Sequence, residues 1–284
     1  MCGPCLAARC HSLPLASDVR LGWSTELWRH RGLIASLAAN GVAGRYRGSW
    51  FGLLWPFLQP LLLIGVFSLV FAYVMPLKWV VERGAALSFP LFLYSGFVVF
   101  SLFSEAVGSA PGLVLDQANL VKKVVFPLEV ISVASVTTLT LFFLMNLGVF
   151  MAALSVWGPG IAPTWPYVLL FIAPLYLFLV GISWFLSALT VYVRDVAHMI
   201  GLVISAVMFL TPVFYPLHTV PDKARALLLL NPLTVVIEGL RAVMIEGALP
   251  DWHSLGLLWI VALVVLQLGW WWFQRLREGF ADVL

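Results

Sequence analysis

Nucleotide hydrolysis is the chemistry that the residue types exclude most directly. The chain has four lysines, and none follows a glycine as the phosphate-binding Walker A loop requires. Neither the zinc motif His-Glu-x-x-His nor the nucleophile motif Gly-x-Ser-x-Gly occurs in the sequence. The sequence therefore indicates that this chain does not hydrolyse ATP by that machinery, and it gives little support to an enzymatic function.

The three cysteines are the remaining candidates for a metal site. Cys2, Cys5 and Cys10, with His11 beside the last, have the residue types and part of the spacing of zinc ligands. The segment around them, residues 1–17, is irregular and unpatterned, and we interpret it as a disordered leader. The sequence predicts no metal site and no cofactor bound by this chain.

Glu105 is the acidic residue that lies inside an apolar run. An intramembrane carboxylate can mark a proton or ion path, which leaves a secondary transporter or channel as an alternative function. The other explanation is that Glu105 lies near a span end or faces an interior partner. A second alternative, a membrane-embedded glycan-modifying enzyme, would use polar residues without metal or triad spacing: Glu238, Glu246, Asp251 and His253.

The composition assigns the chain to a class. Hydrophobic residues make up 62% of its 284 residues, charged residues only 10%, and the mean hydropathy is +1.01. Globular proteins carry about 25% charged residues. We therefore expect an all-α, polytopic integral membrane protein whose residues 18–284 form one membrane domain. The net charge of +3 and the lack of a basic patch argue against nucleic acid as a partner.

A helical hairpin is the clearest element. From Glu129 to Arg194 no Asp, Glu, Lys or Arg occurs, a stretch that as one helix would be about 96 Å long. A hydrocarbon core is about 30 Å thick, so the chain must turn back. The turn lies at Trp157–Pro166, where Gly and Pro break the helix and two Trp suit the membrane boundary.

Charge-poor windows predict six transmembrane helices, and the loops between them predict the orientation. With the N-terminus inside, eleven Lys and Arg lie in cytoplasmic segments and five lie outside, as the positive-inside rule favours. Both termini are then cytoplasmic. The predicted spans lie near residues 53–75, 87–114, 128–156, 167–193, 196–215 and 254–273.

Two further segments are neither plain spans nor plain loops. Residues 24–40 predict an amphipathic helix that begins at Ser24 and ends at Asn40-Gly41; we expect it to lie flat in the cytoplasmic interface, and a soluble docking helix is the alternative. Residues 222–246 are too polar for hydrocarbon, and they predict two short helices on the outer face that meet at Asn231-Pro232.

Three stretches together resemble one family. They are Arg45–Pro56 (RYRGSWFGLLWP) before the first span, Asn119–Glu129 (NLVKKVVFPLE) between spans two and three, and Asn231–Thr234 (NPLT) with Glu238–Arg241 (EGLR) in the outer loop. In this order the sequence is similar to the membrane subunit of ATP-binding-cassette exporters of polysaccharides, which serve capsule, O-antigen and teichoic acid. The resemblance covers about residues 18–284, and residues before Asp18 depart from it.

The resemblance implies partners and a function. The chain would be a permease of the bacterial inner membrane, paired with a second copy and with two copies of an ATPase that binds ATP and Mg²⁺. The cargo would be a lipid-linked polysaccharide, with capsule the first choice and O-antigen the next, and envelope-spanning export proteins and membrane lipids would be further partners.

The resemblance also implies roles for residues. The ATPase would couple through Asn119, Lys122, Lys123, Phe126, Pro127, Glu129, Arg194 and Asp195. The cytoplasmic mouth of the glycan path would hold Arg45, Tyr46 and Arg47, whose arginines would meet either a lipid-linked phosphate or anionic headgroups. Aromatic residues along the path would be Phe57, Phe67, Phe71, Phe214 and Tyr215. An outer gate would comprise Asn231, Pro232, Glu238 and Arg241.

Overall fold

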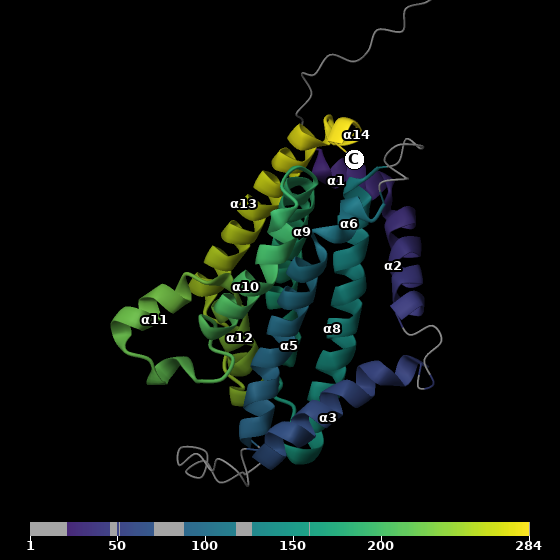
Figure 1. Ribbon diagram of the computed structural model, residues 1–284. Coiled ribbons are helices and arrows are strands. Elements are labelled where there is room, and N and C mark those ends of the chain that lie inside the picture. Colours follow the sequence, from purple (N-terminus) through teal and green to yellow (C-terminus); the bar gives the residue numbers. More distant parts are fainter. Residues whose placement is uncertain are drawn as a thin grey trace, which may run out of the picture.

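The computed structural model describes residues 22–45, 50, 52–70, 88–117, 127–158 and 160–283. These residues form helices and no β-strand, which confirms the all-α prediction, and most of the long helices lie side by side in one bundle (Figure 1). In chain order the helices are α1 (Trp23–Arg29), α2 (Arg31–Arg45), α3 (Trp55–Leu69), α5 (Ser88–Ser109), α6 (Gly112–Leu115), α8 (Glu129–Trp157), α9 (Val168–Tyr192), α10 (Asp195–Phe209), α11 (Asp222–Leu229), α12 (Pro232–Arg241), α13 (Trp252–Arg277) and α14 (Phe280–Val283); short 3₁₀ turns lie at Gly52–Leu54, Trp165–Tyr167 and Leu217–Thr219, and a π-helical turn lies at Ala242–Glu246.

The predicted hairpin is confirmed as α8 and α9. The α8 helix ends at Trp157, and Gly158 N and Gly160 N both donate to Leu154 O, at 3.0 and 3.2 Å. Gly160 has a φ of +93°, a backbone conformation that favours glycine. The end of the bundle at this turn is called the Trp157 end below, and the opposite end, where α8 begins, is called the Glu129 end.

The tightest helix crossing joins α9 to α13. A Cβ on Gly269 would lie 2.2 Å from Gly181 O, and a Cβ on Gly181 would lie 2.6 Å from Val265 O. The two backbones therefore touch where both helices carry glycine. Small residues allow such close approach, which drives helix association in membranes by van der Waals packing. The α9–α13 pair forms one side of the bundle (Figure 1).

Four of the six predicted spans are confirmed by length and composition. In the described part of the chain, α5, α8, α13 and α9 with its preceding turn are long and apolar enough to cross a membrane. The other two predicted spans correspond to α3 and α10, which have fifteen residues each and so are only about 22 Å long. The span predicted at 53–75 continues into residues outside the described ranges.

The N-terminal helix differs from its prediction. It begins after Gly22 rather than at Ser24, breaks at His30, and continues past Asn40-Gly41 to Arg45. The α2 helix packs along α8, where Thr138 Oγ1 lies 3.4 Å from Ala38 O and a Cβ on Gly41 would lie 2.7 Å from that hydroxyl. Glycine did not end the helix because the close approach to α8 requires it there.

The segment of residues 222–246 forms two helices, as predicted. The helices α11 and α12 meet at Asn231-Pro232, as predicted, with a bend of 102°, and together they are apolar enough to count as a broken span. The α11 helix projects from the bundle, whereas α12 packs against α5, α9 and α13 (Figure 1). The bundle accommodates the charged residues of α12 because Arg241 and Glu238 have partners there.

We predict that Gly269→Ala destabilises the protein by about 1–3 kcal/mol, because the added methyl group overlaps the α9 backbone. Thermal unfolding of the purified protein in detergent measures the effect. Gly256→Ala on the same helix is the matched control, since a Cβ there meets no atom within 4 Å. Equal melting temperatures for the two variants would contradict the proposed backbone contact.

Candidate gating and coupling sites

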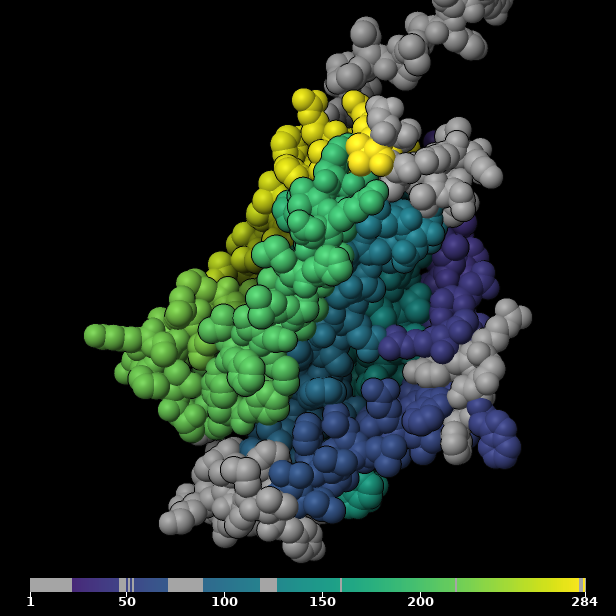
Figure 2. Space-filling model, viewed as in Figure 1, coloured from purple at the N-terminus to yellow at the C-terminus, as the bar shows by residue number. Residues whose placement is uncertain are grey.

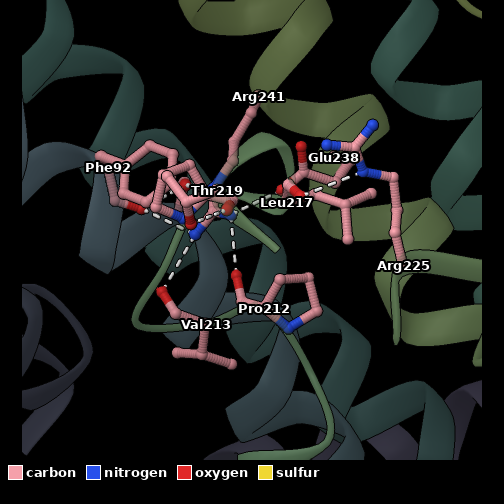
Figure 3. A network of polar contacts seen from close by, with 10 residues as sticks. Phe92, Pro212, Val213, Leu217, Thr219, Arg225, Glu238 and Arg241 are labelled. Carbon is pink, nitrogen blue, oxygen red and sulfur yellow. Dashed lines mark hydrogen bonds and ion pairs between the residues drawn. The ribbon is translucent and has the colours of Figure 1, made fainter. Parts of the chain in front are cut away.

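Arg241 is the centre of a polar network inside the bundle (Figure 3). Its guanidinium joins α12, α5 and the segment that follows α10, and it stacks on the Phe92 ring with 3.6 Å from the Cζ atom to the ring centre. The hydrogen bonds run from Nε to Ser95 Oγ (3.1 Å), from Nη1 to Pro212 O (2.7 Å) and Glu238 Oε1 (2.8 Å), and from Nη2 to Phe92 O (3.2 Å) and Val213 O (3.0 Å).

These contacts satisfy a guanidinium that has almost no access to solvent. Arginine carries five N–H donors, and the network supplies five acceptors for a side chain that is 3% exposed. Glu238, 33% exposed, provides the counter-charge. A side chain at position 96 of α5 would not fit beside the site, because a Cβ on Gly96 would lie 2.8 Å from Arg241 Nη2 and 3.0 Å from Val213 Cα.

Asn231 forms a second link to the end of α10. Its Oδ1 accepts the Leu233 N–H (3.0 Å), which caps α12, and Pro232 occupies the first helical position, where its missing N–H costs nothing. The Asn231 Nδ2 group donates to Thr211 Oγ1 (2.9 Å), and that hydroxyl lies 2.7 Å from Val207 O. The four residues predicted as an outer gate therefore lie on one helix and attach it to residues 211–213.

Glu129, one of the predicted coupling residues, makes its contacts inside the bundle. Its side chain is 4% exposed and both carboxylate oxygens lie 3.2 Å from Arg277 Nη1 on α13. The Trp184 indole N–H on α9 donates to Glu129 O (3.0 Å). Glu129 thus joins α8, α9 and α13, and it offers little surface to another protein.

The structure describes only some of the other predicted coupling residues. Arg194 and Asp195 are exposed in the turn between α9 and α10, at the Glu129 end. Nearby, Tyr192 donates to Leu276 O (2.8 Å), which holds the end of α13 against α9. Pro127 precedes α8 by two residues and accepts the Val130 N–H. The remaining predicted residues lie outside the described ranges: Asn119, Lys122, Lys123 and Phe126.

Arg45 and Glu105 form an ion pair that the sequence did not predict. Arg45 Nη1 lies 2.7 Å from Glu105 Oε2, and the guanidinium covers the Phe142 ring of α8 at 4.8 Å. The two side chains are 39% and 42% exposed. Glu105 is therefore not an isolated proton carrier of the kind that the channel alternative requires. Tyr46 and Arg47, the other residues predicted at the mouth, lie outside the described ranges.

The predicted path aromatics are distributed over two elements. On α3, Phe57 is exposed, whereas Phe67 packs edge-on against Phe97 of α5 with ring centres 6.2 Å apart. After α10, Phe214 is partly exposed and the Tyr215 hydroxyl donates to Phe209 O (3.2 Å). Phe71 lies outside the described ranges.

Among the polar residues that the enzymatic alternative would use, Asp251 has a structural role. Asp251 caps α13 by accepting the N–H groups of His253 and Ser254 and the Ser254 hydroxyl. These hydrogen bonds, that of the hydroxyl most of all, lower the pKa of the Asp251 carboxyl. Within the described ranges no three His, Cys, Asp or Glu side chains gather as metal ligands; Cys2, Cys5, Cys10 and His11 lie outside those ranges.

Comparison with known proteins assigns the family. The model of the ABC-2 type transporter family matches residues 33–245, which include the Arg45–Glu105 and Glu238–Arg241 ion pairs. The chain belongs to the ABC-2 type transporter family. It is 34% identical to the O-antigen export system permease protein RfbA of Myxococcus xanthus over 261 residues, covering 90% of this chain and 97% of the relative.

Further relatives carry related names. RfbA of Klebsiella pneumoniae is 28% identical, with 89% of this chain and 95% of the relative covered. The polysialic acid transport protein KpsM of Escherichia coli is 26% identical, with 83% and 90% covered. These relatives are named as permease or transport proteins, which are transport components rather than enzymes, and this ABC-2 chain is a transport component as well.

Sequence reasoning missed the partners of the charged residues. Glu238 and Arg241 stand at i, i+3 in the sequence, a spacing at which opposite charges can pair on a helix, and the structure shows this pair at 2.8 Å; Ser95 and Phe92, however, lie about 150 positions away and have no polar motif of their own. A usable signal was the presence of charge in segments that are otherwise apolar. Such charges need partners inside the bundle.

We predict that Arg241→Gln destabilises this ABC-2 protein by about 3 kcal/mol or more, because Glu238 and several buried carbonyl groups lose their donor. Lys223→Gln on the projecting α11 is the control; this lysine is exposed, so a change within about 0.5 kcal/mol is expected. Thermal unfolding measures both. Comparable losses in the two variants would show that the Arg241 network does not hold the bundle together.

Proposed function

We propose that this chain is the permease subunit of an ATP-driven exporter that moves a lipid-linked cell-surface polysaccharide across the bacterial inner membrane. The observation that carries the proposal is the similarity to an O-antigen export permease over 97% of that relative's length. The absence of a Walker A sequence fits a permease that depends on a separate ATPase for ATP and Mg²⁺.

O-antigen is the first choice of cargo and capsular polysaccharide the second. This reverses the order inferred from the sequence motifs. The relatives named for O-antigen export are 34% and 28% identical to this chain, whereas the polysialic acid transport protein is 26% identical.

Two copies of the chain would form the conduit, and α10 supports this assembly. None of its residues is buried, and Figure 2 shows the region of α10 and α11, coloured green, on the surface of the molecule. Ala197, Gly201 and Ser205 are exposed at four-residue spacing, which suits close packing against another membrane helix. A second copy placed there would shield Leu202 and Phe209, which are 74% and 73% exposed.

The Glu129 end would face the cytoplasm and receive the ATPase. Lys122, Lys123 and Phe126 would contact it from the loop before α8, with Arg194 and Asp195 beside them. The contacts of Glu129 with α9 and α13 would transmit a displacement of that loop to these two helices. At the Trp157 end, α12 would move together with residues 211–213, because Arg241 and Asn231 bind both, and this coupled motion would open the exit.

The test of function is export from cells that lack the gene for this chain. We expect surface polysaccharide to disappear on deletion and to return when the chain is supplied together with its ATPase. Immunoblotting of surface glycan measures the result. Return of the glycan with an ATPase that cannot hydrolyse ATP would contradict an ATP-driven mechanism.

We predict that the ATPase co-purifies with the chain and that the triple variant Lys122→Ala, Lys123→Ala, Phe126→Ala reduces its recovery at least several-fold. The loss of two charges and one apolar contact would account for a reduction of this size, at about 1 kcal/mol or more for each contact. Lys223→Ala, on the projecting α11, is the control and should leave recovery unchanged. Normal export by the triple variant would show that this loop is not the coupling element.

A further inference from the structure

The carboxyl end of α13 contacts the ends of two other helices at the Glu129 end of the bundle. Arg277 Nη1 lies 3.2 Å from both carboxylate oxygens of Glu129, the first residue of α8. The hydroxyl of Tyr192, the last residue of α9, donates to Leu276 O (2.8 Å). Two consecutive residues of α13 therefore bind the start of α8 and the end of α9.

The residues that follow α13 add apolar packing to these contacts. Phe280 is 1% exposed and packs against Tyr192 and Phe273, with ring centres 6.2 and 5.7 Å apart. A Cβ on Gly279 would overlap the Tyr192 hydroxyl oxygen, so a side chain there would displace the tyrosine ring. The α13 clamp is the name used below for the contacts among Glu129, Tyr192, Leu276, Arg277 and Phe280.

The charge of Glu129 explains why α13 is bound at this place. The Glu129 side chain is 4% exposed, and a buried carboxylate needs a counter-charge. The start of α8 supplies part of it, because the N-terminus of a helix favours an anion. Arg277, which is 37% exposed, supplies the rest. A movement that separated the start of α8 from α13 would leave this carboxylate without its cation, so the two helix ends are held together.

The α13 clamp adjoins the closest helix crossing of the bundle. Trp184 Nε1 donates to Glu129 O (3.0 Å), and the Trp184 ring lies 5.1 Å from the ring of Trp270 on α13. Trp184 lies three residues beyond Gly181, and Trp270 directly follows Gly269, the two glycines at which the backbones of α9 and α13 touch. A displacement of the start of α8 therefore acts on α9 and α13 together.

We propose that Arg277 is a positioning residue for energy coupling: acting through Glu129, it makes the start of α8 and the α9–α13 pair move as one unit when the ATPase works. The inference rests on the proposed function and names the residue on which the transmission of movement depends. Glu129 is then an internal anchor and not a contact surface for the ATPase. Arg194 and Asp195 follow Tyr192 within three residues, so the α13 clamp also holds this second predicted coupling element.

A coupling contact and a purely structural contact differ in what their loss does. Loss of a structural contact lowers the amount of folded protein, while each folded complex continues to export at its usual rate. Loss of a coupling contact leaves the ATPase bound and active but lowers the export obtained from each ATP. Nearness in space alone does not establish coupling, so the two quantities have to be measured separately.

The test compares export with ATP hydrolysis for the full-length chain produced together with its ATPase. Surface glycan is quantified in cells by immunoblotting, per copy of the chain in the membrane, and ATP hydrolysis is measured on the purified complex. We expect Arg277→Gln to retain the ATPase and most of its hydrolysis rate, and to lower surface glycan about tenfold, the effect of one hydrogen bond to a charged group. Arg275→Gln, at an exposed position in the same last turn of α13, is the control and should change neither quantity.

Arg277→Lys tests whether the charge itself is what matters. A single nitrogen of Arg277 contacts both oxygens of Glu129, so an ammonium group can take its place, although this is not so where arginine binds a carboxylate with two nitrogens. Export with Arg277→Lys should therefore recover most of what Arg277→Gln loses.

Tyr192→Phe tests the α13 clamp without disturbing the buried charge. It removes one hydroxyl and keeps the ring that packs against Phe280. We expect a several-fold loss of export with hydrolysis unchanged. Tyr176→Phe is the matched control, because it removes a hydroxyl that lies 2.9 Å from Thr137 Oγ1 within the α8–α9 hairpin, and it should leave the export per ATP unchanged.

Three results would overturn the proposal. Surface glycan per copy could be unchanged in Arg277→Gln, it could fall only in proportion to ATP hydrolysis, or the ATPase could be lost on purification, which would assign this end of α13 to docking. If Arg277→Gln does not fold, Tyr192→Phe decides by the same criteria. Failure of the unsubstituted chain to restore surface glycan would instead contradict the proposed function itself.

Discussion

The need to satisfy charge inside an apolar bundle governs this structure. Arg241 is enclosed by α5, α12 and the segment after α10, and all of its donors find acceptors on those elements. A buried guanidinium without such partners would be prohibitively costly, so these elements must come together as a unit. The glycine at position 96 lets α5 approach closely enough to complete the network.

Three sets of charged contacts join elements that the chain does not connect locally. Glu129–Arg277 joins α8 to α13 at the Glu129 end, Arg45–Glu105 joins α2 to α5, and the Arg241 network ties α12 to α5. A transporter must change shape without exposing unpaired charge to lipid. Polar links that can exchange partners permit this, whereas continuous apolar packing such as the α9–α13 glycine contact resists it.

The bent pair α11–α12 shows how a charged segment packs inside an apolar bundle. Residues 222–246 contain several charged residues, yet most residues of α12 are buried. Burial is possible because Glu238 neutralises Arg241 within one helical turn and because Asn231 caps the helix and contacts Thr211. The same segment supplies both the polar anchors and the apolar stripe, Leu233, Val236, Ile237 and Leu240, that packs against the bundle.

The amino-acid sequence by itself determined the class of the protein, the hairpin of α8 and α9, the break at Asn231-Pro232 and the Glu238–Arg241 pair. Each of these depends on residues close together in the chain, through hydropathy, helix-breaking residues or i, i+3 spacing. Only the tertiary structure decided that α2 continues through Gly41 along α8, that Glu105 faces Arg45, and that Glu129 is enclosed by α9 and α13. These facts depend on which helices approach one another. That choice is made by packing and charge pairing between residues 55 to 148 positions apart, which no local pattern records.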